Sequence, residues 1–136
     1  MRETQLKQVP FFSTLSKREL ATVAQQIDEI DVASGRVLAR EGDLGHEFFV
    51  IVEGTAEVVR GDTRLAELGA GDFFGEMALV DEERRTATVT ATSPMRVLVM
   101  TRQSFRAIDR SMPAVHKAIV EAIKERRAAT QHATTG

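Results

Sequence analysis

The spacing of apolar residues changes twice along this chain, from helical to strand-like and back, and glycine separates the short runs of the middle part. Between Gly35 and about Met100 these runs are rich in β-branched and aromatic residues, and turns such as Glu41-Gly42-Asp43 and Arg60-Gly61-Asp62 connect them. Many short strands at regular spacing are typical of a sandwich, roll or barrel. We therefore predict an α+β fold, in which a jelly-roll-like β-roll (a double-stranded β-helix) is flanked by N-terminal and C-terminal helices. The expected strands lie in RVLAR, EFFVIV, TAEVVR, TRLAEL, TATVTA and MRVLVM.

The N-terminal helix is marked by a capping box. Ser16 and Glu19 have the S-x-x-E spacing, in which the side chain of each residue bonds the backbone N–H of the other. The helix is therefore expected to begin at Lys17. Its apolar residues recur at helical spacing and predict one buried face, formed by Leu20, Val23, Ala24 and Ile27.

Two further helices are expected after the strands. Thr101 can cap a short helix that carries Phe105 and Ile108, and Pro113 stands where the first residue of a last helix belongs. That helix should end near Arg127 and has an apolar stripe of Val115, Ala118, Ile119, Ala122 and Ile123. We expect one domain over residues 1–128 and a flexible tail over residues 129–136, which are small and polar.

Composition excludes several classes of function. The 136 residues include no cysteine, which removes disulfides, thiolate metal sites and thiol nucleophiles. A net charge of −2 gives no electrostatic footprint for nucleic acid. No apolar run is long enough to cross a membrane, and the N-terminus lacks the apolar core of a secretory signal. We therefore expect a cytoplasmic protein that binds neither nucleic acid nor membrane.

The segment from Gly71 to Ala91 carries the chemistry. Gly75 permits close backbone approach, and the amides after it begin a short helix, so that unpaired N–H donors can receive an anion. Glu76 can accept a hydrogen bond from a sugar hydroxyl. Beyond the acidic stretch Asp81-Glu82-Glu83, a chain reversal can return the guanidinium of Arg85 to the same anion as a bidentate partner. These residues predict a phosphate and sugar site.

The pattern FGEMAL at residues 74–79, followed by RTATVTA at residues 85–91, resembles the phosphate-binding cassette of cyclic-nucleotide-binding domains. This is the family of the catabolite activator protein and of the regulatory subunits of protein kinase A. The segments VPFFSTLSKREL and EGDLGHEFFVIVEGTAEV are also similar to their family counterparts, so the likeness covers most of the chain. The resemblance implies that phosphate and ribose bind Gly75, Glu76, Met77, Ala78, Arg85, Thr86 and Ala87.

The same resemblance implies an apolar pocket for the purine and a mobile lid. Val58, Leu65 and Val89 would line the pocket. The last helix would be the lid, with Ile119, Ile123 and Arg126 as its contact residues. Thr86 is compatible with either base, and cAMP is favoured over cGMP as the ligand. Arg84 stands where many members of the family have proline, and we expect its side chain to face solvent.

Two alternatives remain beside a cyclic-nucleotide sensor. The first is a degenerate domain that keeps the fold, binds no ligand and acts as a scaffold through the apolar face of its last helix. The second is a cupin-like enzyme, but His46, His116 and His132 have no second ligand at metal-binding spacing. In addition, no histidine lies near Ser13, Ser16, Thr86 or Thr88 to act as a base. We predict no catalytic residue, no metal and no cofactor. We expect a stand-alone sensor that signals through an unknown effector protein, and the C-terminal helix is the candidate surface for a homodimer.

Overall fold

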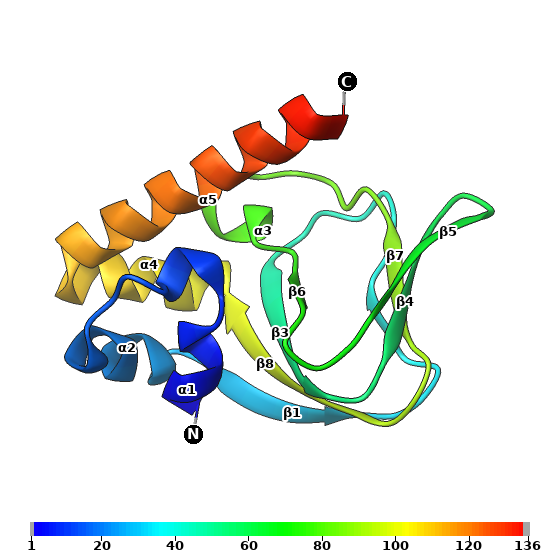
Figure 1. Ribbon diagram of the computed structural model, residues 1–136, viewed down its shortest axis with the longest axis horizontal. Helices are drawn as coiled ribbons and strands as arrows, with labels where there is room; N and C mark the ends of the chain where they lie inside the picture. The colour runs from blue at the N-terminus through cyan, green and yellow to red at the C-terminus, as the bar shows by residue number, and fades with distance from the viewer. Residues whose placement is uncertain (1, 135–136) are drawn as a thin grey trace. The chain divides into compact units, whose positions relative to one another are not determined.

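The computed structural model describes the backbone of residues 2–134 and the side chains of residues 3–126. It divides into two compact units, one of residues 27–102 and one formed by the residues up to 26 and from 103 onward. The elements in chain order (Figure 1) are α1 Arg2–Lys7, η1 Pro10–Phe12, α2 Lys17–Ala24, β1 Asp28–Val32, β2 Val37–Ala39, β3 Glu47–Glu53, β4 Ala56–Arg60, β5 Thr63–Leu68, β6 Phe73–Phe74, α3 Met77–Val80, β7 Thr88–Ala91, β8 Met95–Thr101, α4 Arg102–Ser111 and α5 Pro113–Thr134.

The unit of residues 27–102 consists of two antiparallel four-stranded sheets, with strand orders β1-β8-β3-β6 and β2-β7-β4-β5. The predicted α+β fold with a β-roll is confirmed, and each expected strand is present. The loop between β4 and β5 has two residues, because Arg60 pairs with Thr63, and Gly61 begins it with a φ of 59°. Such a left-handed residue suits a tight hairpin, because its twist matches that of the strands.

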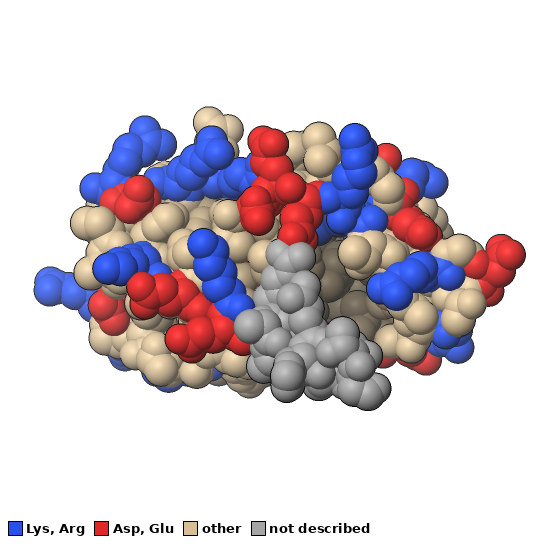
Figure 2. Space-filling model, turned by 90° about the horizontal axis from the view of Figure 1, so that it is seen from above, with Lys and Arg blue, Asp and Glu red and all other residues tan. Residues whose placement is uncertain are grey.

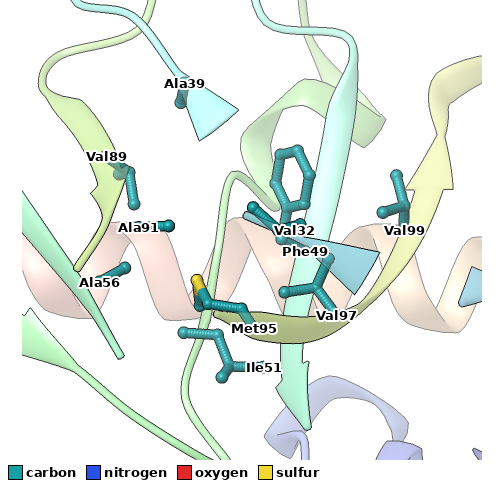
Figure 3. Packing of buried hydrophobic residues seen from close by; sticks show 10 residues of the cluster. All are labelled: Val32, Ala39, Phe49, Ile51, Ala56, Val89, Ala91, Met95, Val97 and Val99. Carbon is teal, nitrogen blue, oxygen red and sulfur yellow. The ribbon is translucent and has the colours of Figure 1, made fainter. Parts of the chain in front are cut away.

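Apolar side chains from both sheets meet in one core (Figure 3). The first sheet contributes Phe49 and Val97, which are nearly inaccessible to solvent, and the second contributes Ala56 and Val89. Successive residues of a strand point to opposite faces, so alternate apolar residues are sufficient to line this interior. Burial of these apolar side chains stabilises the fold by about 25 cal/mol for each Å² of apolar surface that is removed from water.

The second unit is helical. Its capping box is present as predicted: Ser16 Oγ accepts from the backbone N–H of Glu19 at 3.1 Å, and Glu19 Oε1 accepts from the N–H of Ser16 at 2.8 Å. Helix α2 therefore begins at Lys17. Helix α4 buries Phe105 and Ile108, as predicted.

Helix α5 begins at Pro113, as predicted, but its backbone continues to Thr134, beyond the expected end near Arg127. Alanines at 128 and 129 follow that residue, and alanine has the highest helix propensity. The side chains of the predicted flexible tail, residues 129–136, lie outside those described, so that tail and the domain limit at 128 stay predictions.

Candidate functional site

The segment from Gly75 to Val80 is a tight turn followed by one turn of helix, α3. Gly75 has a φ of 84°, which residues with a side chain rarely adopt. The first helical bonds run from Ala78 N to Gly75 O and from Leu79 N to Glu76 O, each 3.1 Å. The N–H groups of Glu76 and Met77 precede these bonds, so they have no acceptor within the helix. Because α3 has only four residues, few peptide dipoles add up along it, so what it offers to an anion is N–H donors rather than a helix-dipole charge.

A chain reversal returns Arg85 to Gly75, as the sequence predicts. Backbone hydrogen bonds fix the return on both sides of Arg85: Arg85 N donates to Asp43 O at 2.7 Å, and Gly42 N donates to Arg85 O at 2.9 Å. Gly45 N donates to Glu83 O at 3.1 Å and holds the acidic loop in the same way. The loop before β3 therefore determines where the Arg85 side chain leaves the backbone.

The guanidinium of Arg85 lies against two glycines, Gly45 and Gly75, which we call the glycine pair. A Cβ on Gly45 would stand 2.7 Å from Arg85 Nε, and a Cβ on Gly75 would stand 2.6 Å from Arg85 Nη1. Both distances are shorter than any tolerated carbon–nitrogen contact. The predicted close approach at Gly75 is therefore an approach by the chain's own arginine, and Gly45 provides a second one.

Arg85 uses little of its bonding capacity. Within the described part of the chain, its guanidinium makes one hydrogen bond, from Nη2 to Glu47 O at 2.7 Å. A guanidinium has several N–H donors, so most of them are left for a ligand. Burial lowers the pKa of Arg85, whereas the charges of Glu47 and Glu76 raise it. The group is therefore a partly desolvated cation that is stabilised by the negative charges of Glu47 and Glu76.

The residues predicted to surround the base lie on three neighbouring strands. Val58 of β4 pairs with Val89 of β7, and Val89 is buried while Val58 is half-buried. Leu65 lies on β5, the next strand of the sheet, and 47% of it is exposed. Because about half of its side chain is open to solvent, Leu65 has apolar surface with which it could cover a ligand.

The remaining cassette residues lie close to Arg85 in the chain. Met77 is half-buried and Ala78 is buried in α3, Thr86 is exposed, and Ala87 is half-buried. The carbonyl oxygen of Thr86 accepts a hydrogen bond from Arg60 Nε at 3.0 Å.

Arg84 faces solvent, as expected. In addition, its Nη1 donates to Gly42 O at 2.8 Å, and its backbone forms an isolated antiparallel bridge with Leu44. Arg84 therefore connects the segment before Arg85 to the loop that contains Gly42 and Leu44.

Arg102 is a site residue that sequence reasoning missed. It ends the sheet unit, and its Nε donates to Ala78 O at 2.7 Å, while its Nη2 donates to Gly45 O at 3.1 Å and to Asp81 O at 2.8 Å. The acceptors of Arg102 are backbone carbonyls, which every residue type has. The sequence therefore does not indicate which residues Arg102 bonds. Gly45 was missed because a glycine after a turn is usually part of that turn.

The predicted lid residues belong to the helical unit. Ile119 and Ile123 of α5 are fully buried, α5 contacts η1, and Arg126 is exposed.

Figure 2 shows one face of the molecule, and basic and acidic side chains of the described residues are mixed on it. The described residues contain no group of three or more His, Cys, Asp or Glu that could hold a metal ion, and no described helix is long and apolar enough to span a membrane.

A family model described as "Cyclic nucleotide-binding domain" matches residues 29–111, which include both sheets except for Asp28, the first residue of β1, as well as the glycine pair, Arg85 and Arg102. The chain belongs to the cyclic-nucleotide-binding domain family. It is thus a regulatory binding module by family, and the resemblance seen in FGEMAL and RTATVTA is confirmed.

Individual relatives agree with this assignment. A cAMP-dependent protein kinase regulatory subunit of Hypocrea atroviridis is 33% identical over 79% of this chain, and a cyclic nucleotide-gated potassium channel of Rhizobium etli is 36% identical over 88%. The matched regions are 23% and 33% of those two proteins, so this chain corresponds to one part of much longer relatives. The N-terminal domain of a transcriptional regulator from Streptomyces coelicolor has a TM-score of 0.85 with 28% identity, covering 96% of this chain and 94% of that one.

Proposed function

We propose that this domain binds cyclic AMP, in preference to cyclic GMP, as a regulatory sensor and does not alter it chemically. The observation that carries the proposal is the state of Arg85: its guanidinium lies on the glycine pair, and Gly75 directly precedes the amides of Glu76 and Met77. Among the described residues the guanidinium has one hydrogen-bond acceptor, so most of its donors are left for a ligand. A cyclic phosphate carries one negative charge on two exocyclic oxygens, which matches a bidentate guanidinium. Glu76 is the proposed acceptor for the ribose hydroxyl, and Thr86 and Ala87 flank the phosphate.

The purine is proposed to lie over Val58 and Val89, with Leu65 covering it from β5. Burial of the Leu65 side chain by the base would contribute about 1 kcal/mol or more, because roughly half of it is exposed without ligand. We base the preference for adenine on the name of the Hypocrea relative, a cAMP-dependent kinase subunit, whereas a relative in Eimeria tenella is named a cGMP-dependent protein kinase. Cyclic GMP is the competing ligand, since Thr86 offers a hydroxyl to either base.

Calorimetric titration with each nucleotide tests the site. Arg85→Leu should lower the affinity for cAMP at least about tenfold, because it removes a charge-assisted bidentate contact. Arg96→Leu is the matched control: Arg96 is an exposed arginine of β8 whose ion-pair partners are Glu29, Asp31 and Glu53. A folded chain that binds neither nucleotide refutes the proposal, and equal affinity in Arg85→Leu puts the ligand elsewhere.

A separate experiment tests the proposal that the domain does not alter cAMP chemically. The proposed contacts are backbone amides, a guanidinium, a carboxylate and apolar side chains, which bind a phosphodiester but supply no nucleophile or metal to open it. We expect cAMP to be recovered intact after prolonged incubation, and its affinity to be unchanged by a chelator, because we propose neither a metal nor a cofactor. Release of 5′-AMP by the purified chain, lost in Arg85→Leu, would contradict this.

For the output, α5 is proposed as the element that changes its packing when ligand binds, with Ile119, Ile123 and Arg126 as its contact residues. A ligand shifts an equilibrium only if it prefers one arrangement, so hydrogen exchange along α5 should differ between free and cAMP-bound chain. The proposed recipients of the signal are an effector protein in the cytoplasm or a second copy of this chain joined through α5. Light scattering with and without cAMP distinguishes self-association from a monomer that needs another partner.

A further inference from the structure

Arg102 occupies an unusual position for a cation. Its side chain is only 12% exposed, and the carboxylate near it, Glu82 Oε1, is 3.5 Å from Nη1 and belongs to a residue whose side chain is 79% exposed. Burying a guanidinium is costly unless its donors are satisfied. Three backbone carbonyls satisfy them here, those of Ala78, Asp81 and Gly45.

These three carbonyls belong to both halves of the phosphate site. Ala78 lies in α3 and Asp81 directly follows it, and the last carbonyls of a helix have no partner within the helix. An isolated helix of one turn is unstable in water, so α3 depends on bonds from outside it. Gly45 is the residue against which the Arg85 guanidinium lies. One side chain thus holds the segment with the amide donors and the glycine behind the cation.

The base of the Arg102 side chain is itself fixed. Its backbone N–H donates to His46 O at 2.9 Å, next to the last residue pair between β3 and β8, Glu47 and Thr101. The side chain therefore begins directly after β8, an inner strand of its sheet, and extends to the Gly45 loop and to α3. Neither of these two segments belongs to a sheet.

We propose that Arg102 is a positioning residue for the cyclic nucleotide: without touching the ligand, it sets the spacing between the Gly75–Ala78 amides and Arg85. This inference rests on the proposed function. Lysine cannot take its place fully, because an ammonium is one point charge and does not present the planar fork that reaches carbonyls of two separate segments.

The test compares Arg102→Met and Arg102→Lys with Arg96→Met, which removes an arginine of β8, the strand that ends directly before Arg102, where its ion-pair partners are residues of other segments. Affinity for cAMP is measured by calorimetry under conditions in which circular dichroism shows every variant folded. We expect a loss of about tenfold or more for Arg102→Met, an intermediate loss for Arg102→Lys and none for Arg96→Met. A folded Arg102→Met variant with wild-type affinity overturns the proposal.

Hydrogen exchange in the ligand-free chain gives a second readout that is independent of binding. In Arg102→Met, exchange should accelerate at the amides of Ala78, Leu79 and Asp81, which bond within the α3 turn, and at Gly45. Uniform acceleration across the sheets, or none, would overturn the positioning role and leave the proposed function standing. If the wild-type chain binds no cyclic nucleotide, the proposed function fails instead, and the exchange pattern alone decides whether Arg102 orders this segment.

Discussion

Gly45→Ala should separate ligand binding from stability, because it adds a single methyl group beside Arg85. The backbone of Gly45 does not have the positive φ that favours glycine, so alanine introduces no backbone strain there. Its Cβ would stand 2.7 Å from Arg85 Nε, 2.8 Å from Cζ and 3.0 Å from Nη1. Ordinary contact begins at 3.4 Å, so the guanidinium must move by about 0.7 Å to restore it.

This displacement is large on the scale of a hydrogen bond. The bond from Arg85 Nη2 to Glu47 O is 2.7 Å, and a movement of that size brings it to the edge of bonding distance. A phosphate that meets the displaced cation loses much of a charge-assisted contact, about 1.5–3 kcal/mol, or about tenfold to a hundredfold in affinity. The clash is with the far end of a flexible side chain, so the free energy of unfolding should change by less than about 1 kcal/mol.

The assay is calorimetric titration with cAMP together with urea unfolding. Gly69→Ala is the matched control, because Gly69 also lacks a positive φ and a Cβ there would meet nothing within 4 Å. It should bind cAMP as the wild type does and be equally or slightly more stable, since alanine restricts the unfolded chain. Unchanged affinity in Gly45→Ala would refute the argument that the glycine pair sets the position of the cation.

Three further outcomes are expected. Gly54→Ala should lower the free energy of unfolding by more than about 2 kcal/mol in urea titration, because Gly54 has a φ of 95° and the added Cβ would meet the carbonyl oxygen of Pro94. Gly61→Ala is the control: a Cβ there would meet nothing within 4 Å, so the free energy of unfolding should fall by only about 1 kcal/mol. Ser16→Ala removes the capping box and should cost about 1 kcal/mol in the same titration. Burial lowers the pKa of Arg85, but a guanidinium is such a weak acid that it keeps its charge at every pH in ordinary use. Calorimetry should therefore find the same cAMP affinity from about pH 6 to 9, and a drop near neutrality would point to another titrating group.

Local signals explain what the sequence predicted well. The capping box defines the start of α2 because both of its bonds lie within four residues, and Pro113 defines the start of α5 through its own fixed φ. The return of Arg85 to Gly75 was predictable from the acidic turn between them and from a motif that the family shares.

Elements formed by distant pairing were not predicted. Strand β1, DEIDV, has three acidic residues in five and reads as a solvated segment. It is a strand because it pairs along its whole length with β8, and because Arg96 of β8 forms ion pairs with Glu29 and Asp31. Strand β6 has two residues and exists through its pairing with β3, where Phe49 and Phe74 stack at 4.8 Å. Such partners are far apart in sequence, and no local pattern marks them.

The donors that Arg85 leaves unused have a consequence for how this protein is handled. A partly desolvated guanidinium beside backbone N–H groups attracts small oxyanions in general, not only a cyclic nucleotide. Phosphate and sulfate from ordinary buffers would therefore occupy the same place and compete with the nucleotide. Apparent affinities should weaken as either anion is added and stay nearly constant when chloride supplies the same ionic strength, so buffer composition becomes part of any comparison between this domain and its relatives.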